Sequence, residues 1–287
     1  MKPLRWSIVG VGVAGRARAR AIAQDPRAEL VGVWRGRFAA DVGAPLLPSF
    51  QAAVEAADAV AVCSPTPVHR AQVEAALRAG RHVAVEFPLA QRAAAARSLF
   101  DLADRMSRVL HVEHIELLEP AGRTLCGQLR PEIIDEVRVR FERPGPADAG
   151  APALALANVA RLHRLCALAG PVAGILDVTA IPGRLEARLR MAVGCTAQLC
   201  FEQSPYLRRA TTIEVDTPTD RWRQVDGTLQ RNGKDQSLLG VRSLFGRDHA
   251  FAMRAILEGA EPYVARDRVL HVLEVVERLA AEQPGPL

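Results

Sequence analysis

The chain has 287 residues, of which 49% are hydrophobic and 24% are charged, so it can bury a large core and form two domains. Its net charge of +5 arises from arginines spread along the whole sequence, and only 5% of the residues are aromatic. A nucleic-acid-binding protein typically gathers basic residues on one face and stacks aromatic side chains on bases. The composition therefore argues against disorder and nucleic-acid binding. It favours anionic small molecules, because arginine binds phosphates and carboxylates through a planar fork of donors.

The five cysteines are odd in number and show neither a C-x-x-C motif nor a Cys/His metal spacing, so we expect no disulfide framework and no metal site. Met1 leads within a few residues into a strand-like segment, which leaves no room for a signal peptide. No apolar run reaches the length of a membrane span. These features predict a cytoplasmic protein that is not attached to a membrane.

The first 120 residues alternate between short apolar runs and helical patterns. The runs that predict strands are Leu4–Val9, Glu29–Trp34, Ala59–Cys63, Arg81–Val85 and Val109–Val112. The patterns that predict helices are Ala14–Gln24, Val68–Ala79 and Gln91–Met106. Alternation of strands and helices favours a parallel sheet. We therefore predict an α/β Rossmann domain over residues 1–120.

The second half of the chain changes character. Its strand candidates follow one another with a single helix, about Asn158–Ala169, among them; they are Ile134–Phe141, Gly174–Ile181, Leu185–Val193, Thr196–Glu202 and Thr211–Val215. This order favours a large, mostly antiparallel sheet. Two amphipathic helices, Asp248–Glu258 and Ala265–Ala281, end the chain, and Arg143–Pro152 is the best candidate for a flexible loop at the mouth of a site. We predict a substrate and oligomerisation domain over residues 121–287, with a homo-oligomer formed through its sheet as a further expectation.

A glycine-rich turn joins the first strand to the first helix. Gly10, Gly12 and Gly15 fit the pattern G-x-G-x-x-G, with Val13 and Ala14 at the start of the helix. Gly10 permits a tight turn, Gly12 lets the backbone approach a pyrophosphate, and Gly15 packs the helix closely on the strand. Three glycines in a turn can also be merely structural. Their place at the start of an alternating α/β chain favours nucleotide binding.

The end of the second predicted strand indicates which dinucleotide is preferred. An NAD site would carry an acidic residue there to accept a hydrogen bond from the ribose 2′-hydroxyl. This chain has Trp34-Arg35-Gly36-Arg37 instead. Two guanidinium groups suit a 2′-phosphate, and Trp34 or Arg35 can lie against the adenine ring. The pattern favours NADPH over NADH, and the alternative is a basic surface loop.

Two segments resemble a known family. They are Cys63-Ser64-Pro65-Thr66-Pro67-Val68-His69 and Ala79-Gly80-Arg81-His82-Val83-Ala84-Val85-Glu86-Phe87-Pro88. Both look like core motifs of the glucose-fructose oxidoreductase/inositol dehydrogenase family. The resemblance implies that these segments contact the cofactor through Ser64, Pro65, Thr66, His69, Glu86 and Phe87. Family members usually carry Glu-Lys-Pro where this chain has Glu86-Phe87-Pro88, and the Lys is their general acid or base for sugar oxidation. Its absence disfavours sugar dehydrogenation.

The biliverdin reductase branch of this family also lacks that Lys and has an aromatic residue, usually Tyr, in its place. The segment 108–118 closely resembles the one that follows the last Rossmann strand in that branch, and the helix containing Arg161 resembles the helix whose Arg supports protonation of the substrate. Resemblance covers most of the chain and is close in the first 120 residues and around Arg161. It implies NADPH-dependent reduction of biliverdin to bilirubin by hydride transfer to the central methine carbon.

The same resemblance implies the site residues. The residues expected to touch the tetrapyrrole are Glu113, His114, Arg161 and Arg164, and those expected to support catalysis are Arg161, His114, Glu116 and Phe87. Each has a simpler alternative: Phe87 can be a packing residue, His114 and Glu116 can be caps or surface residues, and Arg161 can form a surface ion pair. Two other functions stay open. One is a family reductase acting on another substrate, such as an imine or a cyclic carbonyl compound, and the other is a non-catalytic NADP sensor.

Overall fold

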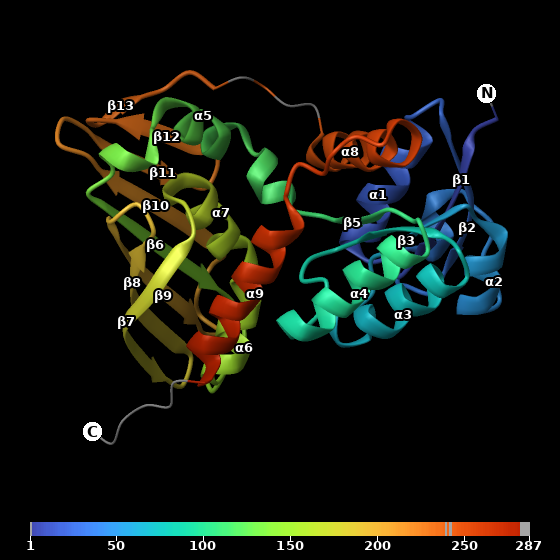
Figure 1. Cartoon of the computed structure of the whole chain (residues 1–287), viewed down its shortest axis with the longest axis horizontal. Coiled ribbons are helices and arrows are strands. Elements are labelled where there is room, and N and C mark those ends of the chain that lie inside the picture. Colours follow the sequence, from blue (N-terminus) through green and yellow to red (C-terminus); the bar gives the residue numbers. More distant parts are fainter. Residues whose placement is uncertain (1, 239, 241–242, 282–287) are drawn as a thin grey trace. The chain divides into compact units, whose positions relative to one another are not determined.

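The computed structural model describes residues 2–238, 240 and 243–281, and within them the chain divides into two compact units (Figure 1). The first unit holds the chain up to Ile115 and also the described part of the segment that ends at Arg266. The second unit holds the described residues from Glu116 to Gly240 and from Asp267 to Ala281. The prediction had assigned all of residues 121–287 to one domain, so the structure differs from it over the helix that returns to the first unit.

The first unit is built on a five-stranded parallel sheet, which confirms the predicted fold class of this part. Its strands are β1 (Leu4–Val9), β2 (Ala28–Trp34), β3 (Ala59–Val62), β4 (His82–Val85) and β5 (Leu110–Val112), in the order β2-β1-β3-β4-β5. All four residues of β3 are buried, because helices cover both faces of a parallel sheet. The helices are α1 (Val13–Ala23), α2 (Phe50–Ala56), α3 (Thr66–Arg78) and α4 (Ala93–Arg105). The sequence analysis missed α2, which has only seven residues and is capped by Ser49.

Helix α8 (Leu244–Glu258) belongs to the first unit because its apolar face completes that unit's core. Ala252 and Met253 are fully buried in one cluster with Trp6, Ile8 and Ile22. Burial of apolar side chains is the main favourable contribution to packing, and α8 buries its face against α1 and against Trp6 of β1. The amphipathic pattern of α8 was visible in the sequence, but its partner was not.

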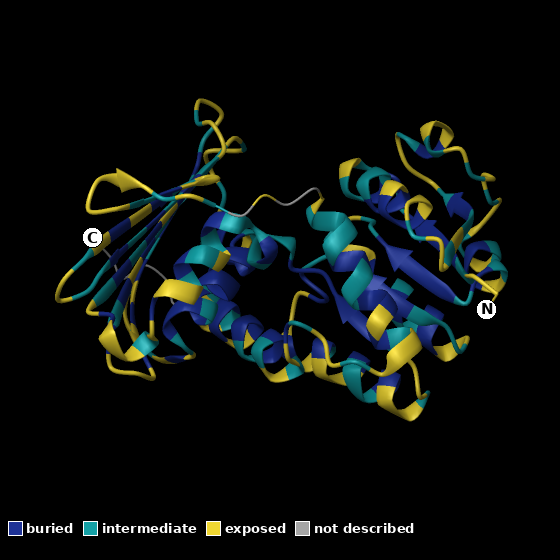
Figure 2. Ribbon diagram, turned by 90° about the horizontal axis from the view of Figure 1, so that it is seen from above, coloured by how far each residue is buried: buried dark blue, intermediate teal, exposed yellow. Residues whose placement is uncertain are grey.

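The second unit contains an eight-stranded sheet that is antiparallel except between β6 and β9, as predicted in outline. Its strands are β6 (Glu136–Arg143), β7 (Val172–Ile181), β8 (Arg184–Met191), β9 (Thr196–Gln203), β10 (Ala210–Asp216), β11 (Arg221–Val225), β12 (Thr228–Arg231) and β13 (Lys234–Asp235). Along β8 and β9 every second residue is buried, so one face meets the core and the other meets solvent (Figure 2).

Helices cover the inner face of this sheet. They are α5 (Pro120–Gln128), α6 (Ala151–Ala157), α7 (Val159–Ala169) and α9 (Arg266–Ala281). Instead of one helix among the strands, two helices lie between β6 and β7. Helix α6 begins where the predicted loop 143–152 ends, because Pro152 lies in its first turn, where proline is compatible with a helix. Among the described residues there are also the short 3-10 segments η1 (Ala39–Val42), η2 (Ile115–Leu118) and η3 (Pro131–Ile133). No described helix is long and apolar enough to cross a membrane.

The core of the second unit yields a test of its packing. Phe201 in β9 is fully buried, whereas Tyr206 in the following loop is 95% exposed. We expect Phe201→Ala to lower the free energy of unfolding of this unit by about 3–5 kcal/mol, because it removes buried apolar surface and leaves a cavity. The matched Tyr206→Ala should change it by less than about 0.5 kcal/mol. Chemical denaturation measures both, and equal effects would contradict the assignment of Phe201 to the core.

Candidate active site

The carboxyl ends of β1 and β3 meet at the point where the strand order of the first sheet reverses. Ligands of open α/β sheets bind at such a switch point. Gly10 follows β1 with φ of +90°, and a Cβ atom on it would lie 2.6 Å from the backbone nitrogen of Ser64, which follows β3. Only glycine permits this approach. The two loops that border the expected nucleotide site are therefore in direct backbone contact.

The other two glycines of the motif have different surroundings. A Cβ on Gly15 would lie 2.3 Å from the carbonyl oxygen of Gly10, so Gly15 allows α1 to pack against the turn. A Cβ on Gly12 would meet nothing within 4 Å, and Gly12 caps α1 with no side-chain hydrogen bond to the helix N-terminus. Val13 beside it is exposed and Ala14 is half-buried. The open space over Gly12 and the N–H groups of α1 fit a pyrophosphate, which helix N-termini bind.

The residues predicted to select NADPH follow β2 and lie against the glycine turn. A Cβ on Gly36 would come within 2.3 Å of the backbone nitrogen of Val11, so this turn touches the glycine-rich segment. Arg35 and Arg37 are exposed, and neither forms an ion pair within the described part of the chain. Trp34 is half-buried, with the Arg35 guanidinium 6.0 Å from the centre of its ring. Two arginine charges next to the glycine turn fit the extra phosphate of NADP.

The family segment after β3 begins α3 and is held by His69. The Nε2 atom of His69 lies 2.6 Å from the carbonyl oxygen of Ser64, and its Nδ1 atom lies 2.9 Å from that of Pro88. Both polar atoms of this fully buried ring therefore contact backbone, and His69 ties together the loops after β3 and β4. The cofactor contact predicted for His69 stays a prediction. Pro65 is exposed and Thr66 is half-buried at the start of α3, where both can still reach a ligand.

The Glu86-Phe87-Pro88 segment follows β4 and contains a cis peptide bond between Phe87 and Pro88. The Phe87 ring stacks on the imidazole of His114, with centroids 5.9 Å apart and planes 17° from parallel. The Glu86 carboxylate lies 3.4 Å from the guanidinium of Arg18, a buried residue of α1. Phe87 and His114 thus form one aromatic pair at the ends of β4 and β5, where the sequence analysis had treated them separately.

Three residues that the sequence analysis did not single out, Arg18, Asp248 and Tyr263, are linked to this segment and to His114 by polar contacts. Arg18 forms an ion pair with Asp248 of α8, and Asp248 also accepts a hydrogen bond from Tyr263. Glu113 is fully buried nearby, and burial, together with the charges of Glu86 and Asp248, raises its pKa well above the ordinary value. His111 of β5 is also buried.

In the second unit, Arg161 of α7 is buried, so it does not form a surface ion pair. Its guanidinium lies 3.6 Å above the Phe141 ring and 3.0 Å from the carboxylate of Glu116. Arg209, which the sequence analysis missed, also approaches Glu116, at 3.4 Å. Burial lowers the pKa of Arg161 to about 10, while Glu116 opposes that shift, so the side chain stays charged at neutral pH. Two guanidinium groups thus share one carboxylate.

Arg164, one turn further along α7, is also buried and lies 3.6 Å from the carboxylate of Glu119. Burial raises the pKa of Glu119, and Arg164 acts in the opposite direction. Within the second unit, Arg161 and Arg209 therefore pair with Glu116 of η2, and Arg164 pairs with Glu119. That Arg161 and Arg164 bind the substrate stays a prediction. Glu113, His114 and Phe87 form a second group, in the first unit.

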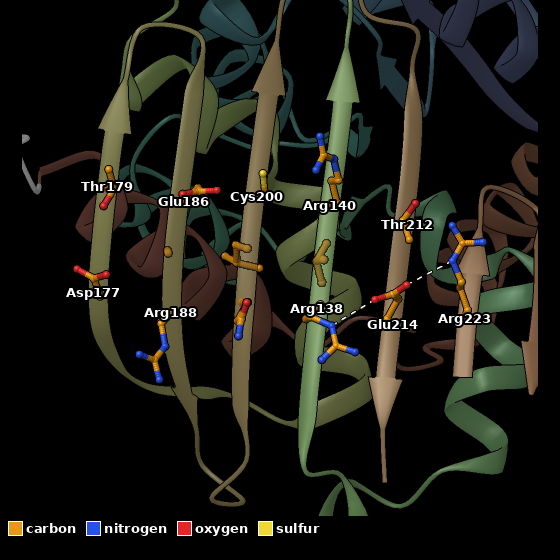
Figure 3. Close-up of a pocket in the computed structure, with 14 residues that line it drawn as sticks. Arg138, Arg140, Asp177, Thr179, Glu186, Arg188, Cys200, Thr212, Glu214 and Arg223 are labelled. Atoms are coloured by element: carbon orange, nitrogen blue, oxygen red, sulfur yellow. Dashed lines mark hydrogen bonds and ion pairs between the residues drawn. The ribbon is translucent and has the colours of Figure 1, made fainter. Parts of the chain in front are cut away.

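A hollow of about 500 Å³ on the outer face of the eight-stranded sheet is a separate feature (Figure 3). Figure 3 shows Glu214 between Arg138 and Arg223, and Arg138 also contacts Glu136 and Asp216. Its charges are largely paired with one another across neighbouring strands. None of the predicted site residues lines this hollow, so it is not the candidate active site.

Comparison with known proteins agrees with this geometry. Residues 4–114 match the model of the oxidoreductase family with an NAD-binding Rossmann fold. Biliverdin reductase A of Mus musculus is 28% identical over 93% of this chain and 92% of that protein. The crystal structure of a Synechocystis biliverdin reductase in complex with biliverdin and NADP+ has a TM-score of 0.84 and 25% identity, covering 97% of this chain and 98% of that one. UDP-N-acetylglucosamine 3-dehydrogenase of Acidithiobacillus ferrooxidans is 34% identical over 50% of this chain and 48% of that protein.

Residues 4–114 therefore resemble the NAD-binding domain of this oxidoreductase family, and the chain is an NAD(P)-dependent oxidoreductase. Among its relatives it is similar over nearly its whole length to biliverdin reductases. A sugar-nucleotide dehydrogenase matches half of the chain at higher identity. The comparisons therefore identify the class of reaction, an oxidoreduction, but they do not identify the substrate.

The surroundings of Gly12 and Gly15 predict opposite defects for the same substitution. Gly12→Ala should fold normally, because its Cβ meets no protein atom, yet lose NADPH binding by filling the space left for the pyrophosphate. Gly15→Ala should lower the melting temperature, because its Cβ would overlap the Gly10 carbonyl oxygen. Thermal unfolding and NADPH titration measure the two effects. Tight NADPH binding by a folded Gly12→Ala protein would show that the pyrophosphate lies elsewhere.

Proposed function

We propose that this protein uses NADPH to reduce biliverdin to bilirubin. The observation that carries the proposal is Phe87, stacked on His114 at the position where sugar-oxidising members of the family carry Lys. Oxidation of a sugar hydroxyl needs a base at that position, and a phenyl ring can neither accept nor donate a proton. Reduction of a methine carbon needs no such group, because the carbon receives a hydride and the accompanying proton goes to a pyrrole nitrogen. A flat aromatic pair at this place suits a planar substrate.

NADPH is the proposed hydride donor, and the bound cofactor supplies the redox chemistry. Arg35 and Arg37 support this choice, since both charges are exposed beside the glycine turn and no acidic residue ends β2. The Synechocystis relative, whose structure contains NADP+ and biliverdin, adds support from a protein of similar length. The protein's own contribution is to hold both ligands in a fixed geometry and to balance their charges.

Arg161 is proposed to support proton delivery. It is held by Glu116 and by the face of Phe141, and its guanidinium stays charged at neutral pH. Arg161 and Arg209 together carry two positive charges against the single carboxylate of Glu116, which leaves an excess suited to the two propionates of a tetrapyrrole. Within this arrangement, Arg161 orients a protonated water or polarises the pyrrole, and Arg164 is a second propionate ligand.

The proposed function is tested by mixing the protein with biliverdin and NADPH and following the change from green to yellow. We expect turnover with NADPH to be much more efficient than with NADH. Replacing Arg35 and Arg37 with Ala should raise the KM for NADPH and leave the KM for NADH unchanged. Each lost contact with the 2′-phosphate should cost about 1–3 kcal/mol of binding free energy. The exposed Arg20→Ala on α1 is the matched control. Equal efficiency with both cofactors would refute the NADPH assignment, and absence of any colour change would refute the substrate.

Arg161 yields a separate prediction about kcat. Arg161→Ala should lower kcat about a hundredfold, equivalent to about 2.7 kcal/mol of transition-state stabilisation, and leave NADPH affinity unchanged. Arg161→Lys should recover only part of this, because an ammonium keeps the charge but lacks the planar fork. Arg190→Ala, at an exposed position of β8, controls for loss of an arginine. If a folded Arg161→Ala protein matches the parent in kcat, proton delivery does not depend on this residue.

A further inference from the structure

The carboxylate of Asp248 is the meeting point of a buried polar network in the first unit. Asp248 lies in α8 and is fully buried. It accepts hydrogen bonds from Arg18 Nη1 at 2.5 Å and from Tyr263 Oη at 2.7 Å, and its Oδ1 atom lies 2.9 Å from His111 Nε2. These partners come from α1, from the segment after α8 and from β5. A buried carboxylate is tolerated only when partners of this kind compensate for its lost hydration.

Two arms lead from this carboxylate to the candidate active site. Through the first arm, the guanidinium of Arg18 that binds Asp248 also reaches Glu86 Oε1 at 3.4 Å. Through the second, the Tyr263 hydroxyl that donates to Asp248 accepts a hydrogen bond from the backbone N–H of His114 at 2.7 Å. The arms therefore end on the residue before Phe87 and on the residue whose ring stacks on Phe87.

Electrostatics shows that the network depends on the charge of Asp248. Burial alone would raise the pKa of Asp248, but Arg18 and His111 lower it below its ordinary value, so the carboxylate stays ionised. Burial raises the pKa of the Tyr263 hydroxyl, and the negative charge of Asp248 adds to that effect, so Tyr263 stays a donor to Asp248. Of the two ion pairs that Arg18 forms in the described part of the chain, loss of this negative charge would leave the one with Glu86.

The sheet order indicates which half of a dinucleotide the network serves. Arg35 and Arg37 follow β2 on one side of the switch point between β1 and β3, and Glu86 and His114 follow β4 and β5 on the other side. Dinucleotides bind across such a switch point. With the adenosine half at the end of β2, the nicotinamide half belongs at the ends of β4 and β5.

We propose that Asp248 is a positioning residue of the oxidoreductase site, which holds Glu86 through Arg18 and the main chain of His114 through Tyr263, and thereby fixes the two strand ends that receive the nicotinamide half of the cofactor. The C-terminal segment that returns to the first unit is then part of the redox site as well as of the core. The proposal depends on NADPH as cofactor and is independent of the identity of the substrate.

The test compares NADPH with 2′,5′-ADP, which has the adenosine half and its extra phosphate but lacks the nicotinamide. Asp248→Asn preserves the shape of the side chain and removes its charge, and Tyr263→Phe removes only the hydroxyl that contacts both Asp248 and His114. Each variant should bind NADPH about tenfold more weakly than the parent and bind 2′,5′-ADP within about twofold of it. Asp104→Asn, at an exposed carboxylate on α4 that pairs with Arg266, is the matched control and should bind both ligands normally.

Titration calorimetry on the full chain gives both affinities, and circular dichroism establishes folding. Equal weakening of both ligands in folded variants would assign the network to general stability, and unchanged NADPH affinity would remove its link to the site; either result overturns the proposal. If Asp248→Asn does not fold, Tyr263→Phe decides between these outcomes. Failure of the NADPH proposal itself would be seen separately, as an unmodified protein that binds NADH more tightly than NADPH.

Discussion

The close approach of the chain after β1 to the chain after β3 is the constraint on which the nucleotide site depends. Gly10 and Gly15 make it possible, since a side chain on either would overlap backbone atoms of Ser64 or of the turn itself. This contact places the N-terminus of α1 at the switch point of the sheet with an open approach over Gly12. Gly36 extends the same constraint, because its contact with Val11 places the two arginines after β2 beside the turn. The polar groups of the cofactor site are therefore arranged mainly by backbone packing.

Replacement of a proton-transferring Lys by Phe87 changes what the site can do. A site with Lys can remove a proton from a hydroxyl as the hydride leaves, which suits sugars. The aromatic pair of Phe87 and His114 offers a flat surface, and burial raises the pKa of the Glu113 carboxyl well above its ordinary value. Positive charge is concentrated instead in the second unit, where Arg161 and Arg209 share Glu116.

The sequence by itself determined those features that are local. Burial on both faces makes the strands of the first unit continuous apolar runs, so their number and order along the chain were predicted correctly, and β1 was predicted with its observed bounds. The glycine motif, the paired arginines after β2 and the substitution at Phe87 were also recognisable, because each depends on residue identity at a fixed spacing from a strand. The short helices α2 and α6 and the small strands β11 to β13 were missed, since elements of this length give little periodic signal.

Only the tertiary structure decided which polar residues act together. Arg18 is one of three arginines at alternate positions along α1, and nothing local distinguishes it from Arg16 or Arg20; it is singled out by Asp248, which lies 230 residues away. Arg209 joins Arg161 only because β10 lies next to β6 in the sheet. The position of α8 in the first unit also depends on tertiary packing. Its apolar stripe predicts that one face is buried, but it does not identify the surface that this face packs against. Periodicity specifies that a face is buried, whereas the partner of a buried charge is set by long-range packing, which the sequence pattern does not encode.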